Sequence, residues 1–250
     1  MANKSGSRHN KRIALPKTRH LSRKIHTWAI RPLPGPHSKL TVLPLGEILR
    51  EKLGRAQNRK EANIILKSKK LLVDGKVRTS TKFPVGLFDV VSLPEEKKQF
   101  RCVFDRKGRL QLVMIPDAEK NTKVCKVTTK KSTGKDTVQL TTEDGRTFSQ
   151  KSGAASVGDS LVLDLSDAGK IKSVLKLEKG HLAYVSSGVH VGTVAQIKDL
   201  TAGTMQKPAL ATLASDTEEF QTIAKNLVII GKEKALLSVK AGEDEDQKEK

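Results

Sequence analysis

Residues 58–75 read NRKEANIILKSKKLLVDG and combine two hydrophobic periods. Ala62, Ile65 and Leu66 fall at i, i+3 and i+4, which predicts a helix with one apolar face. The asparagine that opens the stretch is a favourable N-cap, and a glutamate follows three positions later as in a capping box. The apolar run Leu-Leu-Val then ends in Asp-Gly, which is a signal for a tight turn between strands. The stretch therefore predicts a helix followed by a β-hairpin.

The flanking residues extend this unit in both directions. Residues 45–53 read LGEILREKL and place apolar side chains at i, i+3, i+4 and i+8, which predicts a second helix that stops at Gly54. Residues 88–93 read FDVVSL and predict a further strand after the hairpin. We therefore expect a small two-helix and hairpin domain over residues 44–93.

The rest of the body is predicted to be rich in short strands. Residues 94–175 and 176–233 both alternate apolar runs with turns, which favours small barrels or sandwiches. The strands expected in the first range are Phe100–Phe104, Arg109–Ile115, Lys123–Thr128, Thr137–Thr141, Ser160–Leu165 and Lys170–Leu175. Those expected in the second range are His181–Val185, Gly192–Ile197, Ala209–Leu213, Phe220–Ile223 and Leu227–Ile230. Residues 234–250 are expected to form a charged C-terminal tail, in which the acidic run at 243–246 is solvated.

The N-terminal 40 residues hold half of the excess positive charge. The chain has 47 Lys+Arg against 27 Asp+Glu, a net charge of +20, and residues 1–40 contain ten basic and no acidic side chains. Four prolines in that range predict an extended arm over residues 1–43 that the body does not need for folding. Nucleic acid is the favoured partner of such an arm. A solvated tail and an anionic membrane surface are the alternatives, and the arm lacks the amphipathic stripe that a membrane surface requires.

Trp28 and Ile30 are the sizeable apolar pair in the middle of the arm. We expect Trp28 to anchor the arm on the body of the protein. Stacking on a nucleobase is the less favoured interpretation.

Several classes of function are disfavoured by what the sequence lacks. No run approaches the roughly 18 apolar residues of a membrane span, and the basic N-terminus is not followed by the apolar segment of a secretory signal. Phosphate-binding glycine loops, paired metal-ligand histidines and a Gly-x-Ser-x-Gly elbow are also missing. Cys102 and Cys125 lie in apolar strand patterns and are expected to be small buried hydrophobes. We therefore expect no catalytic residue, metal, cofactor or small-molecule substrate.

Two segments resemble known RNA-binding modules. Asn58, Arg59, Ala62, Ile65, Leu66, Val73, Asp74 and Gly75 resemble the pattern of the S-four RNA-binding domain, which implies a compact unit that docks on structured RNA. Residues 179–198, KGHLAYVSSGVHVGTVAQIK, resemble a KOW motif of an SH3-like barrel. In that motif, Gly192 is expected to allow a strand kink or a close approach of the backbone to RNA.

Taken together, the order of these segments resembles the archaeal and eukaryotic small-subunit ribosomal protein S-four-e family. Arg31-Pro32, Gly35-Pro36-His37, residues 74–79 (DGKVRT) and Lys107-Gly108-Arg109 also resemble that family. The resemblance implies an α+β fold: an extended basic N-terminal arm (1–43), a two-helix and hairpin S-four-type domain (44–93), a β-rich central domain (94–175), a C-terminal SH3-like KOW barrel (176–233) and a charged tail (234–250). The chain length and sparse aromatic residues favour an archaeal member.

The function implied is that of a structural constituent of the cytoplasmic small ribosomal subunit. Its expected partners are small-subunit rRNA and neighbouring ribosomal proteins, with no membrane and no small-molecule substrate. A free RNA chaperone or regulator is the first alternative, and an rRNA-modifying enzyme is the second. The residues expected to contact RNA are Lys4, Arg8, Lys11, Arg12, Lys17, Arg19, Arg23, Lys24, Arg31, His37, Lys39, Arg50, Arg55, Arg59, Lys60, Lys67, Lys69, Lys70, Lys76 and Arg78.

Overall fold

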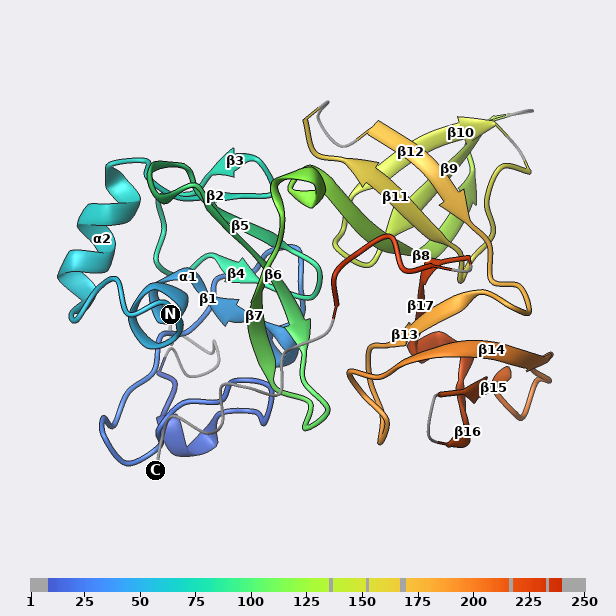
Figure 1. Ribbon diagram of the computed structural model, residues 1–250, viewed down its shortest axis with the longest axis horizontal. Coiled ribbons are helices and arrows are strands. Elements are labelled where there is room, and N and C mark those ends of the chain that lie inside the picture. The colour runs from blue at the N-terminus through green and yellow to red at the C-terminus, as the bar shows by residue number, and fades with distance from the viewer. Residues whose placement is uncertain are drawn as a thin grey trace, which may run out of the picture.

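Three five-stranded antiparallel sheets follow one another along the chain and make up most of the protein (Figure 1). In the computed structural model, the residues described are 9–134, 137–151, 153–166, 170–215, 218–232 and 234–239. The N-terminal unit lies at the left of Figure 1, the central sheet at the upper right and the C-terminal sheet at the lower right. The fold is thus mainly β with few helices, and the longest helix described is α2 (Arg59–Lys67).

The two predicted helices form, but the first has an irregular geometry. It begins as α1 (Leu45–Glu47) and continues as a π-helical turn, Ile48–Lys52, in which the Leu53 amide donates to the Ile48 carbonyl at 2.9 Å. Its apolar stripe is buried as expected, and Gly54 ends it at φ +62°. Asn58 is the N-cap residue of α2 but makes no side-chain capping bond, and the Glu61 carboxylate accepts from the Gln57 amide at 2.8 Å.

The first sheet contains the predicted hairpin. Asp74 and Gly75 both adopt positive φ, which is the conformation that a two-residue hairpin turn requires. The strand order is β3-β2-β5-β6-β7, and the strands are β2 (Leu72–Val73), β3 (Lys76–Val77), β5 (Val90–Leu93), β6 (Lys98–Phe104) and β7 (Leu110–Met114). A separate pair, β1 (Leu43–Pro44) and β4 (Pro84–Val85), joins the end of the arm to this unit.

The first sheet crosses the domain boundary that the sequence analysis placed between residues 93 and 94. β5 pairs with β6 from Val90 opposite Arg101 to Leu93 opposite Lys98. The connection is a 3-10 turn, Pro94–Glu96, followed by Lys97 at φ +52°, so it reverses the chain within one sheet. Antiparallel neighbours can be joined by a turn this short. Because β5, β6 and β7 belong to one sheet, the N-terminal unit extends past residue 93 to about the end of β7.

The central sheet has its own small hydrophobic core. Its order is β10-β9-β8-β11-β12, and the strands are β8 (Thr122–Ser132), β9 (Thr137–Thr142), β10 (Thr147–Lys151), β11 (Ser160–Asp164) and β12 (Lys170–Leu175). Val127, Leu140 and Leu161 lie in that core. The sequence analysis missed β10, because Phe148 is the only large apolar residue in the strand.

The C-terminal sheet shares its core with the N-terminal unit rather than forming an isolated module. Its order is β16-β15-β14-β13-β17, and the strands are β13 (Leu182–Val185), β14 (Val194–Thr201), β15 (Leu210–Ala214), β16 (Glu219–Ile223) and β17 (Leu227–Gly231). One cluster of buried side chains runs from α1 and β6 to β13 and β17. Further 3-10 turns lie at Arg12–Ala14, Lys39–Thr41, Asp117–Glu119 and Ala224–Asn226.

The start of the predicted charged tail packs against the body instead of extending into solvent. Leu237 and Val239 are buried, and Gly231 forms a β-bridge with Ala235. Ser238 donates from its amide to Glu119 Oε2 at 2.9 Å and from its hydroxyl to Glu119 Oε1 at 2.7 Å. The start of the charged tail thus adds Leu237 and Val239 to the common core. The acidic run at 243–246 lies outside the described residues.

Two contacts fix the C-terminal sheet against β6 of the N-terminal unit. The buried Tyr184 hydroxyl accepts from the Phe104 amide at 2.8 Å and donates to the Phe104 carbonyl at 3.0 Å. Gly192, at φ +81°, lies so close to Asp105 that a Cβ added to Gly192 would be 2.7 Å from the carbonyl carbon of Asp105. The close approach expected at Gly192 therefore exists, but it is to the backbone of the same chain.

We expect Tyr184→Phe to lower the free energy of unfolding by about 1–3 kcal/mol, because it leaves the buried Phe104 amide and carbonyl without their partner. Urea unfolding followed by circular dichroism measures this change. Ser132→Ala removes an exposed hydroxyl that bonds the Gly134 carbonyl, and as the matched control it should change stability by no more than about 0.5 kcal/mol. Equal effects of the two substitutions would contradict the role of Tyr184 in fixing the C-terminal sheet against β6.

Candidate nucleic-acid interface

The arm is held on the body by a buried ion pair between Arg19 and Glu47. Arg19 Nε donates to Glu47 Oε2 at 3.1 Å, and Arg19 Nη2 donates to Glu47 Oε1 and, at 2.8 Å, to the Ile30 carbonyl. The Ile30 amide returns a bond to Glu47 Oε1 at 3.0 Å. Arg19 and Glu47 are almost fully buried. The carboxylate at the end of α1 thus organises two distant points of the arm.

Arg12 makes a second inward contact. Its Nη2 donates to Glu51 at 2.5 Å, and its Nη1 donates to the Ser22 carbonyl at 2.8 Å. Burial by itself would raise the pKa of Glu51, but hydrogen bonds from Arg50 and Arg12 hold that pKa below its usual value. Glu51 is therefore a charged partner of the arm.

His37 attaches the end of the arm to a buried carboxylate. Its Nε2 lies 3.0 Å from both carboxylate oxygens of Asp89. The imidazole covers Gly86 so closely that an added Cβ would be 2.3 Å from the ring Cγ, which leaves room only for glycine. Burial opposes the charged imidazole, but the attraction of Asp89 is stronger in sum and raises the pKa of His37 above 6.5.

Asp89 is also part of a cluster that joins the N-terminal unit to the central sheet. Lys123 Nζ donates to Asp89 and, at 2.7 Å, to Asp74, and it lies 3.3 Å from Asp144. Arg146 pairs with Asp74 at 2.6 Å and with Asp144 at 3.1 Å. We call these residues, together with His37, the charged cluster. Burial and the neighbouring Asp89 raise the pKa of Asp74, whereas Lys123 and His37 overcome burial and lower that of Asp89.

These contacts change the set of candidate RNA-binding residues. Arg12, Arg19 and His37 lie inside the protein with carboxylates of the same chain as partners, so we withdraw them as RNA contacts. The expectation that the body does not need the arm is revised for the same reason, since deleting it would leave Glu47 and Asp89 without these partners. These pairings could not be predicted from the sequence, because each acid is more than 25 residues from its base.

The remaining candidates are divided between paired and exposed side chains. Arg55 pairs with Glu96 at 2.5 Å, Lys70 with Glu95 at 3.1 Å, and Arg50 with Glu51 at 2.5 Å. Arg31 and Arg78 are half-buried, and the Arg78 guanidinium lies 4.4 Å from the centre of the Phe83 ring. Lys4 and Arg8 lie outside the described residues. Outside these pairs, the exposed candidates are Lys11, Lys17, Arg23, Lys24, Lys39, Arg59, Lys60, Lys67, Lys69 and Lys76.

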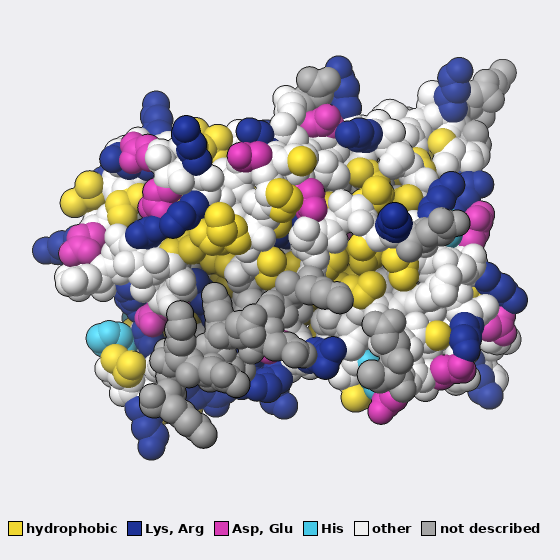
Figure 2. All heavy atoms as spheres, viewed as in Figure 1, with side chains coloured by type: hydrophobic (Ala, Val, Ile, Leu, Met, Phe, Trp, Pro, Cys, Tyr) yellow, Lys and Arg dark blue, Asp and Glu magenta, His cyan; other side chains and the backbone are white. Residues whose placement is uncertain are grey.

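The exposed candidates come from two neighbouring parts of the N-terminal unit, the arm and the α2–hairpin segment. Figure 1 places α2 and most of the arm at the left of the molecule. Figure 2 shows Lys and Arg side chains standing out around the outline of this face, with Asp and Glu among them and hydrophobic side chains toward the middle. This arrangement can neutralise phosphates at several separated points.

Buried cations outside the arm act as connectors between units, and sequence analysis did not single them out. Lys126 Nζ donates to the carbonyls of Ala224, Lys225 and Leu227 at 3.1, 2.7 and 2.8 Å, and burial lowers the pKa of Lys126 to about 8. Arg101 is fully buried and donates to Glu119 Oε2 at 2.6 Å. The one sequence feature that could have indicated these buried cations is a charged residue inside an apolar strand pattern.

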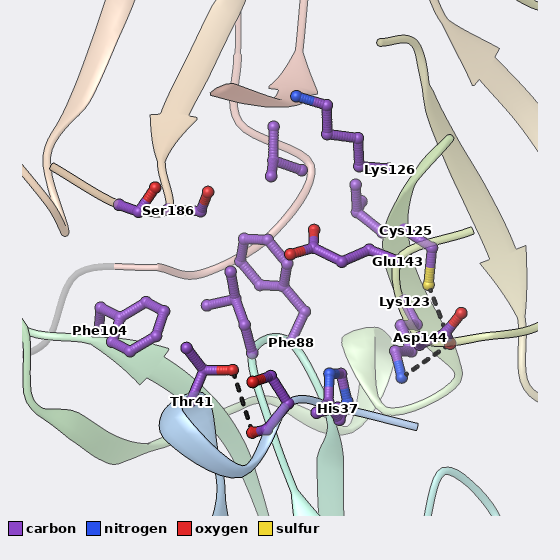
Figure 3. Close-up of a pocket in the computed structure, with 15 residues that line it drawn as sticks. His37, Thr41, Phe88, Phe104, Lys123, Cys125, Lys126, Glu143, Asp144 and Ser186 are labelled. Carbon is purple, nitrogen blue, oxygen red and sulfur yellow. Dashed lines mark hydrogen bonds and ion pairs between the residues drawn. The ribbon is translucent and has the colours of Figure 1, made fainter. Parts of the chain in front are cut away.

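A cavity of about 240 Å³ lies where the arm and the three sheets meet (Figure 3). Its lining includes Phe88, Phe104, Lys126 and Ser186, and the charged cluster borders one side. The Cys125 thiol there donates to Asp144 at 3.3 Å, and its burial raises its pKa well above the usual value. Such a thiol is a poor nucleophile. These groups serve as a joint between units.

Three further observations concern the described residues only. No group of three or more His, Cys, Asp or Glu side chains in them is arranged to hold a metal ion. No helix in them has both the length and the apolar composition needed to cross a membrane. Cys102 and Cys125 are buried free thiols, as the strand pattern predicted.

Comparison with known proteins identifies the family. The model of the ribosomal family S4e matches residues 96–171, and that of the RS4NT (NUC023) domain matches residues 4–40. Small ribosomal subunit protein eS4 of Methanocaldococcus jannaschii is 38% identical over 248 residues, which cover 96% of this chain and all of the relative. The protein of the same name from Caenorhabditis elegans is 38% identical over 236 residues, 94% of this chain and 91% of the relative.

The chain belongs to the S4e family. The crystal structure of the 30S ribosomal protein S4e from Thermoplasma acidophilum is similar at a TM-score of 0.67 and 29% identity, covering 76% of this chain and 95% of that one. The family resemblance drawn from the sequence is thereby confirmed, and so is the β-rich architecture.

Loss of the Arg19–Glu47 ion pair should be far more costly than loss of a surface pair. Arg19→Ala leaves a buried carboxylate without its cation, so we expect the free energy of unfolding to fall by about 3–5 kcal/mol. Arg55→Ala breaks the exposed pair with Glu96 and is the matched control, with an expected loss of about 0–1 kcal/mol. Urea unfolding measures both, and similar losses would show that the arm is not held as described.

The pH dependence of stability should report the His37–Asp89 contact. Because the folded-state pKa of His37 is raised above 6.5, its stabilising contribution is complete below that pH and is lost as the pH rises through the raised value. The stability difference between the unmodified protein and His37→Gln should thus be larger at about pH 6 than at about pH 8.5. His26→Gln, at an exposed arm position, is the control. A difference that grows with pH would contradict this assignment.

Proposed function

We propose that this chain is a structural constituent of the small ribosomal subunit, in the cytoplasm, that binds and stabilises folded rRNA through contacts to phosphates and to RNA shape. Membership of the S4e family carries the proposal, since relatives named as small ribosomal subunit proteins match almost the whole chain. Neighbouring ribosomal proteins are the other partners. The protein acts by binding and not by catalysis.

The arm supports this function because the contacts of its buried side chains with the body hold its exposed side chains in place. Arg12, Arg19 and His37 fix the arm to the body, while Lys11, Lys17, Arg23, Lys24 and Lys39 stay exposed. A pre-organised segment loses less conformational entropy on binding than a free one. The exposed cations then neutralise phosphates that crowd together in folded rRNA.

The α2–hairpin segment, residues 58–78, supplies the second set of contacts in an S-four-type domain. Arg59 and Lys60 lie in the first turn of α2, where positive charge is unfavourable for the helix dipole. A local cost of this kind is expected where a side chain serves an outside partner. Lys67, Lys69 and Lys76 extend the cationic surface to the end of the helix and the hairpin. A-form RNA is recognised mainly through shape and backbone contacts, which suits such a set.

The central sheet and the C-terminal sheet brace this RNA-binding end. We assign the SH3-like KOW fold to the C-terminal sheet, on the resemblance of residues 179–198 and the five-stranded antiparallel order. The Lys126 and Tyr184 contacts hold it to its neighbours.

The salt dependence of RNA binding tests the proposed contacts. If roughly 6–10 phosphates are neutralised, affinity for small-subunit rRNA should fall by about three to five decades between about 50 and 200 mM salt. Arg59→Ala and Lys60→Ala should each weaken binding to RNA of any sequence. Each should also reduce the slope of log affinity against log salt concentration by about 1. Lys198→Ala, in the exposed pair with Glu219 on the C-terminal sheet, is the matched control and should leave the slope unchanged.

Cosedimentation separates the ribosomal role from the alternatives. Stoichiometric recovery with salt-washed small subunits supports the proposal. A mainly free pool would favour a chaperone or regulator, and uridine isomerisation by the purified protein would favour a modifying enzyme. A salt-independent affinity for rRNA would refute the contact mechanism.

A further inference from the structure

Two segments of the arm pair with each other and sort their side chains between the body and solvent. The Arg12 amide donates to the Thr27 carbonyl at 3.0 Å, the Ala29 amide donates to the Asn10 carbonyl at 2.8 Å, and Lys11 faces Trp28 across a β-bridge. Successive side chains of an extended segment point to opposite sides. Arg12 accordingly points to Glu51 in the body, and Lys11 lies exposed beside Trp28.

Trp28 does not serve as the anchor that the sequence analysis expected. It is the only tryptophan in the chain, and 54% of its surface is exposed. Its ring centre lies 5.2 Å from that of the exposed His9, with the planes at 44°. The arm is anchored by ion pairs, so the large apolar ring is left available at the surface. Full burial of such a side chain is worth about 1.5–3 kcal/mol, which the isolated protein does not gain.

The part of the arm that carries Trp28 is apolar and cationic. Ile13, just after the first paired segment, and Ile25, just before the second, are 74% and 67% exposed. Lys11 in the first segment and Arg23 and Lys24 before the second are exposed too, and the first acidic residue in the chain is Glu47. In Figure 2, a histidine and hydrophobic side chains reach the surface side by side at the lower left, on the side where Figure 1 draws the arm.

This combination fits unpaired RNA better than a protein or an RNA duplex. Sites for single-stranded nucleic acid combine a cationic track for the backbone with aromatic rings on which bases stack. Protein–protein interfaces are depleted in lysine. A duplex keeps the faces of its bases stacked within the helix, so only an unpaired base offers a face to the indole.

We propose that the Trp28 indole, with His9 beside it, stacks on an unpaired base of the bound RNA while Lys11, Arg23 and Lys24 neutralise the flanking phosphates. The inference rests on the proposed RNA-binding function and adds to it a site for one nucleotide in a loop, bulge or junction. The arm then distinguishes unpaired RNA from duplex, which its phosphate contacts alone do not do.

The single tryptophan of the full-length protein makes the test direct. Its fluorescence is followed while a single-stranded oligoribonucleotide of about ten nucleotides, or a fully paired RNA duplex of the same length, is added. Filter binding measures the affinity for each RNA independently. We expect the single strand to quench Trp28 on binding, and the duplex to leave the emission unchanged.

Substitutions then test whether the ring contributes to affinity. Trp28→Ala should weaken binding of the single strand by about 5- to 150-fold, Trp28→Phe should retain most of the affinity, and binding of the duplex should be unchanged in both variants. Leu40→Ala, which shortens an exposed apolar side chain elsewhere on the arm, is the matched control and should have no effect. Because Trp28 is largely exposed, the urea midpoint of Trp28→Ala should stay close to that of the unmodified protein.

The failures of this inference and of the proposed function are distinguishable. If the single strand binds by filter assay but leaves Trp28 emission unchanged, or if Trp28→Ala weakens single strand and duplex equally, the stacking site is refuted and RNA binding stands. If polyglutamate quenches Trp28 as strongly as RNA does, the surface accommodates an acidic protein and the inference is overturned. If neither RNA binds and small-subunit rRNA does not bind either, the proposed function itself fails.

Discussion

The neutralisation of three buried carboxylates is the constraint on which the arrangement of this protein depends. Asp74 and Asp89 come from the N-terminal unit and Asp144 from the central sheet, and Lys123 contacts all three. Lys123 and Arg146 supply two positive charges, so the charged cluster is balanced only when His37 of the arm is also protonated. Burial and the neighbouring Asp89 raise the pKa of Asp74, and the attraction of Asp89 outweighs burial and raises that of His37. Buried ion pairs add little net stability but are costly to break, so the cluster favours one relative placement of three segments.

The same principle extends along the arm and has a functional consequence. Arg12 and Arg19 pair with carboxylates of α1 and the following turn. Part of the positive charge of the arm therefore stabilises the fold. The remainder faces solvent in a defined geometry. In the proposed function, folding and RNA binding draw on different side chains of one segment, because neighbouring side chains point alternately to the body and to solvent. Trp28 lies on the outward side because the arm already has polar anchors.

The units beyond the N-terminal one are connected mainly through backbone groups. Lys126 donates to three carbonyls of the C-terminal sheet, and the Tyr184 hydroxyl bonds both backbone groups of Phe104. Together with the common hydrophobic core, these contacts make the C-terminal sheet a support for the N-terminal unit rather than a tethered module. A rigid support is useful to a protein that recognises RNA by shape, since the spacing between separated phosphate contacts must be kept.

The sequence by itself determined the local elements, the β-rich architecture and the family. The helix of residues 58–67, the Asp74-Gly75 turn and most strands were predictable because hydrophobic period and turn chemistry act between residues that are close in the chain. The positions of Arg12, Arg19, His37 and Trp28 were not predictable in this way. A cation meets a carboxylate or faces solvent according to which distant residue lies about 3 Å from it, and an aromatic ring is buried or exposed according to what else anchors its segment. Only the tertiary structure decided those questions, because they depend on contacts between residues far apart in the chain.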